Sequence, residues 1–130
     1  MAEAVGTGLK ILLPIALGGA VGAIMRYLAS LGIHGIAGTG FPYGTLLVNV
    51  LGSFLIGVLY VVIIESPAGF THYRAPLIVG LLGAFTTFSA FSLETIHLLE
   101  GGEPLKAGLN VLLNVILCLA ACWGGLTLAR

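Results

Sequence analysis

One apolar stretch of the chain carries hydroxyl and aromatic side chains in close alternation. It runs from Gly83 to Ser92 and reads GAFTTFSAFS. Glycine, threonine and serine lower helix stability or compete for its backbone hydrogen bonds, so the sequence predicts an interruption between Gly83 and Thr87. An interruption inside a bilayer frees carbonyl groups that can bind a cation, and the half-helix after it begins with a positive end. The alternative is a kinked but continuous helix whose hydroxyls bond to its own carbonyl groups.

Phe88 and Phe91 lie three residues apart in this stretch and therefore share a helix face. The edge of an aromatic ring is positive. Two ring edges that line a pore could contact an anion without trapping it as a full positive charge would. Ordinary packing or contact with lipid is the alternative for such a pair.

Three asparagines occur within strongly apolar segments. Asn49 follows Thr45 by one turn, and Asn110 and Asn114 are four residues apart. Because an unpaired amide in hydrocarbon is costly, each of them needs a hydrogen-bond partner. The amides could join neighbouring helices. They could equally form a polar track whose N–H groups replace the water around a small anion.

Few charges and no catalytic group lie within these segments. Arg26 and Glu94 are the charges nearest to membrane depth, where a charge at the bilayer centre costs about 2.5–3.5 kcal/mol. Arg26 could extend to the lipid surface, and Glu94 could reach water or Arg26. No Ser/His/Asp set, HExxH or CxxC motif occurs, and Cys118 and Cys122 are interpreted as small core residues. These observations indicate neither an enzyme nor a cysteine-ligated metal site.

The elements that hold these residues are predicted to be membrane helices. The chain has 130 residues, of which 58% are hydrophobic and 8% are charged, against roughly 25% charged residues in a soluble domain. Four segments have the roughly 20 apolar residues that a span needs, at about 9–31, 44–64, 76–99 and 105–128. We therefore predict an all-α membrane protein with a single four-helix transmembrane domain over residues 1–130. A net charge of zero without a basic patch argues against a nucleic-acid partner.

Each predicted span also carries small residues four positions apart, a spacing that permits close helix contact in lipid. The pairs are Gly18 with Gly22, Ser53 with Gly57, Gly80 with Ala84, and Ala120 with Gly124. We expect these positions to lie at contacts between helices, either within a bundle or between the subunits of an oligomer.

Four spans place both ends of the chain on one side of the membrane. Lys10, Arg74 and Arg130 then lie on that side, and Arg26 and Lys106 lie on the other. Because basic residues accumulate in cytoplasmic loops, this nearly even distribution gives almost no preference for one orientation. Either a weak bias selects one orientation, or the chain inserts both ways and a dimer could be antiparallel.

Over about residues 15–128 the chain resembles the Fluc (CrcB) family of fluoride ion channels. The resemblance is most specific in the third predicted span, where Gly83 is followed by Thr86, Thr87, Phe88, Ser89, Ala90, Phe91, Ser92 and Glu94. It also includes Gly18, Gly22, Ala23, Arg26 and Tyr27 in the first span and Gly44, Thr45, Asn49, Gly52 and Gly57 in the second. Ala90 stands where the family usually has threonine, and Asn110 stands where many relatives have tyrosine.

This resemblance implies an antiparallel, dual-topology homodimer with two pores, which exports fluoride passively across the inner membrane of a bacterium. The residues that it implies for each pore are Asn49, Thr45, Phe88, Phe91, Ser89, Ser92, Asn110 and Asn114. Arg26 would lie near a wide vestibule and draw anions in. A structural sodium ion would lie on the dimer axis, held by the backbone carbonyls of Gly83 and Thr86 from both subunits.

Two other functions are compatible with four small spans. A small multidrug-type antiporter exchanges protons for a cation and needs a carboxylate within the membrane. The first span has none, and Glu94 lies toward the far end of the third. A subunit that only stabilises a larger complex would need no polar track. Efflux of fluoride but not chloride from liposomes would separate the channel from both.

Overall fold

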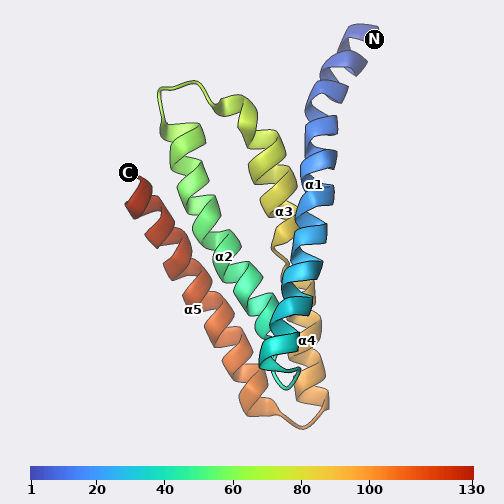
Figure 1. The fold of residues 1–130 in the computed structure, drawn as a ribbon, viewed down its shortest axis with the longest axis vertical. Helices are drawn as coiled ribbons and strands as arrows, with labels where there is room; N and C mark the ends of the chain where they lie inside the picture. The colour runs from blue at the N-terminus through green and yellow to red at the C-terminus, as the bar shows by residue number, and fades with distance from the viewer.

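The computed structural model describes residues 1–130, and all its regular elements are helices (Figure 1). They are α1 (Ala2–Ala37), α2 (Tyr43–Tyr60), η1 (Val61–Glu65), η2 (Thr71–Tyr73), η3 (Arg74–Leu82), α3 (Gly83–Phe85), α4 (Phe88–Glu100) and α5 (Pro104–Ala129). They form four rods that are long and apolar enough to cross a bilayer, Ala2–Ala37, Tyr43–Glu65, Thr71–Glu100 and Pro104–Ala129. Both termini lie toward the same end of the molecule (Figure 1). The predicted all-α class with four membrane-spanning helices is confirmed.

The last three rods end close to their predicted limits, whereas α1 extends beyond the predicted 9–31 at both ends. With 36 residues, α1 is roughly 54 Å long, which exceeds the hydrocarbon core of roughly 30 Å. Hydropathy marks the part of a helix that lies in lipid, not the ends of the helix itself. The helix continues until Gly38, whose φ of 81° is incompatible with a right-handed helix.

Glycines permit the closest contacts between the rods. Gly22 of α1 lies so near η3 that a Cβ atom would collide with the Leu81 carbonyl. Gly57 of α2 and Gly125 of α5 are confined in the same way, each by the backbone of the other helix. Gly124, in contrast, has open space at its Cβ position. Within one chain it is Gly125 that contacts α2, because a helix turns by about 100° per residue and Gly124 faces away from α2.

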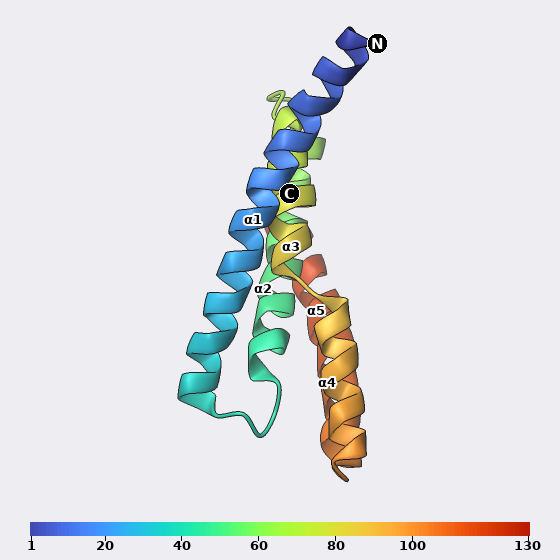
Figure 2. The same ribbon diagram turned by 90° about the vertical axis from the view of Figure 1, so that its right-hand side faces the viewer.

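The third rod is interrupted between α3 and α4. Thr86 (φ −85°, ψ 156°) and Thr87 (φ −151°, ψ 122°) have extended backbone, and the α-helix resumes at Phe88. Before this point η3 and α3 pack against α1, whereas α4 packs against α5 after it. In Figure 2, α4 runs beside α5 and away from α1. Two extended residues thus transfer the third rod from one side of the bundle to the other.

Wider π-helical turns precede the interruption. The Gly83 N–H, at the end of η3, donates to the Ile78 carbonyl five residues earlier. The same five-residue spacing joins the Ser66 N–H to the Val61 carbonyl at the end of η1. Such turns are frequent near functional sites, and η3 leads directly into the interrupted segment.

The interior of the single chain is small. Only 18 of the 130 residues are buried, and the main apolar cluster consists of Val48, Leu82 and Phe85. The long helix α1 buries Gly22 alone. Monomeric soluble proteins rarely expose large contiguous apolar surfaces. Lipid or another protein surface must therefore cover most of the apolar side chains, and the polar residues concentrate at the interruption.

Candidate functional site

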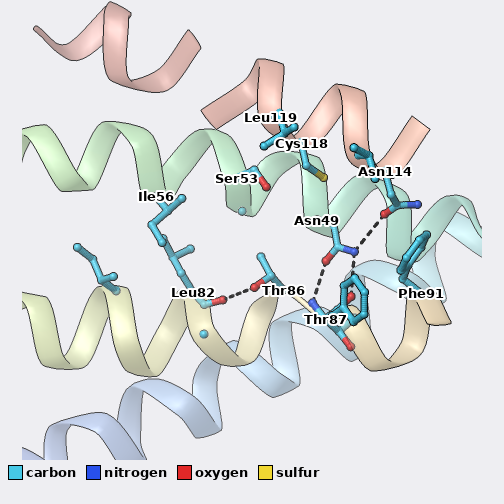
Figure 3. Close-up of a pocket in the computed structure, with 15 residues that line it drawn as sticks. Asn49, Ser53, Ile56, Leu82, Thr86, Thr87, Phe91, Asn114, Cys118 and Leu119 are labelled. Carbon is cyan, nitrogen blue, oxygen red and sulfur yellow. Dashed lines mark hydrogen bonds between the residues drawn. The ribbon is translucent and has the colours of Figure 1, made fainter. Parts of the chain in front are cut away.

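A groove of about 460 Å³ lies at the interruption of the third rod. Residues of α2, α4 and α5 surround it, together with the end of η3, the start of α3 and the residues that join α3 to α4 (Figure 3). Its polar lining includes Asn49, Thr87 and Asn114, and its aromatic lining consists of Phe88 and Phe91. The groove therefore brings together most of the chemical groups that the sequence singles out.

Asn49 bonds to both backbone groups of Thr87. Its Oδ1 accepts the Thr87 N–H at 2.8 Å, and its Nδ2 donates to the Thr87 carbonyl at 2.9 Å (Figure 3). Only 9% of the Asn49 surface is exposed. Because extended backbone at membrane depth has no helical partners, this amide supplies the hydrogen bonds that Thr87 needs.

Five residues from three rods continue this hydrogen bonding, and we call Thr87, Asn49, Asn114, Asn110 and Thr95 the amide ladder. Asn49 Nδ2 also donates to Asn114 Oδ1 at 3.2 Å. Asn114 Nδ2 donates to the Oδ1 and the carbonyl of Asn110, at 3.0 Å and 2.9 Å. Asn110 Nδ2 donates to Thr95 Oγ1 at 2.9 Å. The three predicted asparagines thus come together, and their N–H groups point to protein acceptors.

Sequence reasoning missed two members of the ladder. Thr87 is recognised only as part of the interruption, and Thr95 is not singled out at all. The Thr95 hydroxyl donates to the Phe91 carbonyl at 2.7 Å, which is what an ordinary helical threonine does. Its second role depends on Asn110, which reaches it from α5 across the turn between the two helices.

The two predicted phenylalanines differ in exposure. Phe88 is 79% exposed and Phe91 is 8% exposed. Their ring centroids are 5.3 Å apart and their planes are inclined by 55°. Phe85, in contrast, belongs to the apolar cluster with Val48 and does not line the groove. Of these rings, the Phe88 ring is the one most open to an ion or to a second protein surface.

The predicted serines lie beside the groove and do not line it. Ser92 Oγ donates to the Phe88 carbonyl at 2.9 Å, and Ser89 Oγ lies 3.3 Å from Thr87 Oγ1. Thr87 Oγ1 also accepts the Ala90 N–H at 3.2 Å and so caps the start of α4. The positive end of the α4 dipole therefore lies at the groove.

Thr45 is predicted in the same pore as Asn49 but does not line the groove. Its hydroxyl donates to Glu94 Oε1 at 2.7 Å, while Glu94 Oε2 is buried without a hydrogen-bond partner. Glu94 borders a second cavity of about 240 Å³, together with His34 and His97. The structure therefore places Thr45 at a separate polar site, farther along α4.

Arg26 bonds to the backbone at the end of α3. Its Nε donates to the Ala84 carbonyl at 3.0 Å. The alternative in which Glu94 reaches Arg26 is wrong, because the Glu94 carboxylate bonds to Thr45 instead. A cation is favourable at the negative carboxyl end of a helix, so Arg26 stabilises the interruption from the α1 side.

The carbonyls of Gly83 and Thr86 are among those that lose their usual donors at the interruption. In a continuous helix the Thr87 N–H would donate to Gly83 and the Ala90 N–H to Thr86. Here these N–H groups donate to Asn49 Oδ1 and to Thr87 Oγ1. Unwound carbonyls of this kind can coordinate sodium. No group of three or more His, Cys, Asp or Glu side chains is arranged to hold a metal ion.

Comparison with known proteins gives a consistent picture. Residues 13–126 match the family model described as CrcB-like protein, Camphor Resistance (CrcB). The chain is 58% identical over 119 residues to the fluoride-specific ion channel FluC of Methylococcus capsulatus, a match that covers 92% of this chain and 52% of that protein. It thus spans about half the length of that relative. The FluC of Geobacter sulfurreducens is 49% identical over 92% of this chain and 96% of its own. The FluC of Shewanella amazonensis is 55% identical over 85% of this chain and 89% of its own.

Proposed function

Because the chain belongs to the CrcB family, we propose that it is a fluoride-selective ion channel of the bacterial inner membrane. It would export fluoride passively, down its gradient, and so protect the cell from fluoride. Its four spanning helices make it a multi-pass membrane protein, and a channel catalyses no covalent reaction, so it is not an enzyme. The observation that carries the proposal is the groove at the interruption, where aromatic rings meet the positive end of α4.

The groove suits a small anion that must lose its water to enter a membrane. Phe88 and Phe91 offer ring edges, which are positive but carry no full charge. The N-terminus of α4 adds a partial positive charge, and Ser89 and Ser92 carry hydroxyls in the same turns. Conduction requires binding weak enough for the ion to leave. Partial charges and hydroxyls meet this requirement better than a fixed cation would.

We propose that the working unit is an antiparallel homodimer with two pores. A single chain leaves Phe88 79% exposed and encloses the groove with its own helices only in part. In a two-fold dimer each copy uses the same surface, so a ring from each subunit would meet in each of two equivalent pores. The nearly even distribution of basic residues supports insertion in both orientations.

We further propose a structural sodium ion on the dimer axis, held by the carbonyls of Gly83 and Thr86. The residues fit this role, because both carbonyls have lost their helical donors to Asn49 and to the Thr87 side chain. Bound sodium would neutralise the partial negative charge of these oxygens. It would also join the interrupted rods of the two subunits.

The remaining predicted residues would serve the ends of the pathway. Arg26 uses Nε to bind the Ala84 carbonyl, and its other N–H groups and its charge remain to attract anions toward a vestibule. Thr45, which bonds to Glu94, would extend the polar path toward the far end of α4.

Ion efflux from liposomes tests the channel function. The purified protein is reconstituted in vesicles loaded with potassium fluoride or potassium chloride, and an ion electrode follows efflux after a potassium ionophore is added. We expect rapid fluoride efflux and chloride efflux no faster than from empty vesicles. Proton-coupled cation uptake without fluoride efflux would support the antiporter instead. Absence of any flux, with verified insertion, would support a subunit that only stabilises a complex.

A further inference from the structure

We propose that the amide ladder is a positioning device, which holds α4 at two points and thereby sets how Phe88 and Phe91 face the groove. Thr95 then acts as a positioning residue through its bond to the Phe91 carbonyl. The positioning itself is supported by hydrogen bonds within the chain, whereas its effect on ion flux rests on the proposed channel function.

The first point of attachment is the start of α4. Asn49 of α2 bonds to both the N–H and the carbonyl of Thr87, at 2.8 Å and 2.9 Å. These two bonds to Thr87 fix the orientation of its backbone as well as its position. The Asn49 side-chain amide is itself held by Asn114 of α5, whose Oδ1 accepts from Asn49 Nδ2 at 3.2 Å. Because Phe88 directly follows Thr87, the direction of its Cα–Cβ bond depends on this attachment.

The second point of attachment lies farther along α4. Thr95 Oγ1 accepts the Asn110 N–H at 2.9 Å and donates its own hydrogen to the Phe91 carbonyl at 2.7 Å. Glu94, one residue earlier, accepts the Thr45 hydroxyl of α2 at 2.7 Å. Both points therefore connect α4 to α2 and to α5.

The spacing of the two points explains how they act together. Thr87 and Thr95 are eight residues apart in the sequence, or about 12 Å along a helix axis. A helix held at one end can swing or rotate about that end. A helix held at both points can do so only if a hydrogen bond of the ladder breaks. Four hydrogen bonds, two at Thr87 and one each at Glu94 and Thr95, connect α4 and its N-cap to α2 and α5.

The ladder also leaves few amide hydrogens for an ion. Both N–H groups of Asn49 are used, by the Thr87 carbonyl and by Asn114 Oδ1. The Asn114 N–H groups are directed at two acceptors of Asn110, which is fully buried. An anion that bound these amides would have to displace bonds that fix the interruption. The arrangement therefore favours positioning over direct ion binding for these side chains.

Thr95→Val tests the proposal, because valine keeps the branched shape and removes the hydroxyl. Thr127→Val is the matched control, since the Thr127 hydroxyl is exposed and donates only to carbonyls of its own helix. Thr95→Ser retains the hydroxyl and serves as the rescue variant. Each variant is measured in liposomes for fluoride and chloride efflux. Each is also combined with Phe88→Cys in a Cys118→Ala, Cys122→Ala background, and the rate of reaction with a water-soluble thiol reagent is followed.

We expect Thr95→Val to slow fluoride efflux by about tenfold, a factor that corresponds to about 1.4 kcal/mol and lies within the cost of leaving a polar group without its partner. The thiol reaction at position 88 should change in the same variant, while Thr95→Ser and Thr127→Val should resemble their parent in both assays. Equal effects of the two valine variants, or no change in the thiol reaction, would overturn the proposal. If the unaltered chain conducts no fluoride, the proposed channel function fails, and the thiol reaction alone then decides whether the ladder positions α4.

Discussion

Replacing Asn49 by leucine removes the side chain that holds the interrupted backbone. The amide accepts the Thr87 N–H at 2.8 Å and donates to the Thr87 carbonyl at 2.9 Å and to Asn114 Oδ1 at 3.2 Å. Leucine has the same branched shape and the same number of side-chain heavy atoms but forms none of these bonds. Because Asn49 is only 9% exposed, the variant strands both backbone groups of Thr87 in a site with little access to water.

The size of the effect follows from these two groups. A buried polar group left without its partner costs about 1–3 kcal/mol, so the pair at Thr87 would amount to about 2–6 kcal/mol. Within membranes such groups often find substitute partners, and measured side-chain couplings average only about 0.6 kcal/mol. The groove beside Thr87 could admit such a partner. We therefore expect a destabilisation near the lower limit, about 2–3 kcal/mol.

Equilibrium unfolding in mixed micelles measures this quantity. The fraction of a denaturing detergent is increased, and the fluorescence of the single tryptophan, Trp123, reports unfolding. Ser53→Ala is the matched control, because Ser53 lines the same groove but is not part of the amide ladder. If Asn49→Leu and Ser53→Ala unfold at the same detergent fraction, the Asn49 amide does not hold the interruption, and the reasoning is refuted.

Three further predictions follow from the same structure. Phe88→Ile should slow fluoride efflux more than Phe85→Ile, because Phe88 lines the groove whereas Phe85 lies in the apolar cluster; equal efflux rates would remove the case for Phe88 as a pore ring. Gly22→Ala should lower thermal stability by several degrees, since the new Cβ collides with a backbone carbonyl, while Gly124→Ala, with open space at its Cβ, should not; similar melting temperatures for the two variants would argue against close packing of α1 on η3. Exhaustive replacement of sodium by a bulky organic cation should abolish fluoride efflux; unchanged efflux after verified removal would count against the structural sodium ion.

Hydropathy was sufficient to predict the four spans, because partition into lipid depends on composition averaged over a whole segment. It was not sufficient for details that depend on one residue. The long α1 continues through Pro14 and ends only at Gly38, whose positive φ does not fit a right-handed helix. The choice of Gly125 over Gly124 at the contact with α2 is a rotation of about 100°, and composition does not specify it.

The candidate site was predictable only in part. The apolar surroundings of the three asparagines required hydrogen-bond partners, and the structure provides them within the amide ladder. The identity of the partners was not predictable, because it depends on where α4 lies after the interruption. Thr45 and Asn49 share one face of α2, yet Thr45 meets Glu94 in the middle of α4 and Asn49 meets Thr87 at its start.

Side chains from several helices hydrogen-bond to the backbone at the interruption, and they determine which of its backbone groups remain without a partner. Arg26 covers the Ala84 carbonyl, Asn49 covers both backbone groups of Thr87, and the Thr87 hydroxyl covers the start of α4. In hydrocarbon, where an unpaired backbone group is costly, these bonds favour one fixed geometry over a flexible joint. The Gly83 and Thr86 carbonyls that we propose for sodium are among those left without helical donors, and the ring left most exposed is Phe88. A second copy and a cation would cover these remaining groups. In the proposed dimer, the exposed Phe88 ring and the carbonyls without donors would therefore favour association.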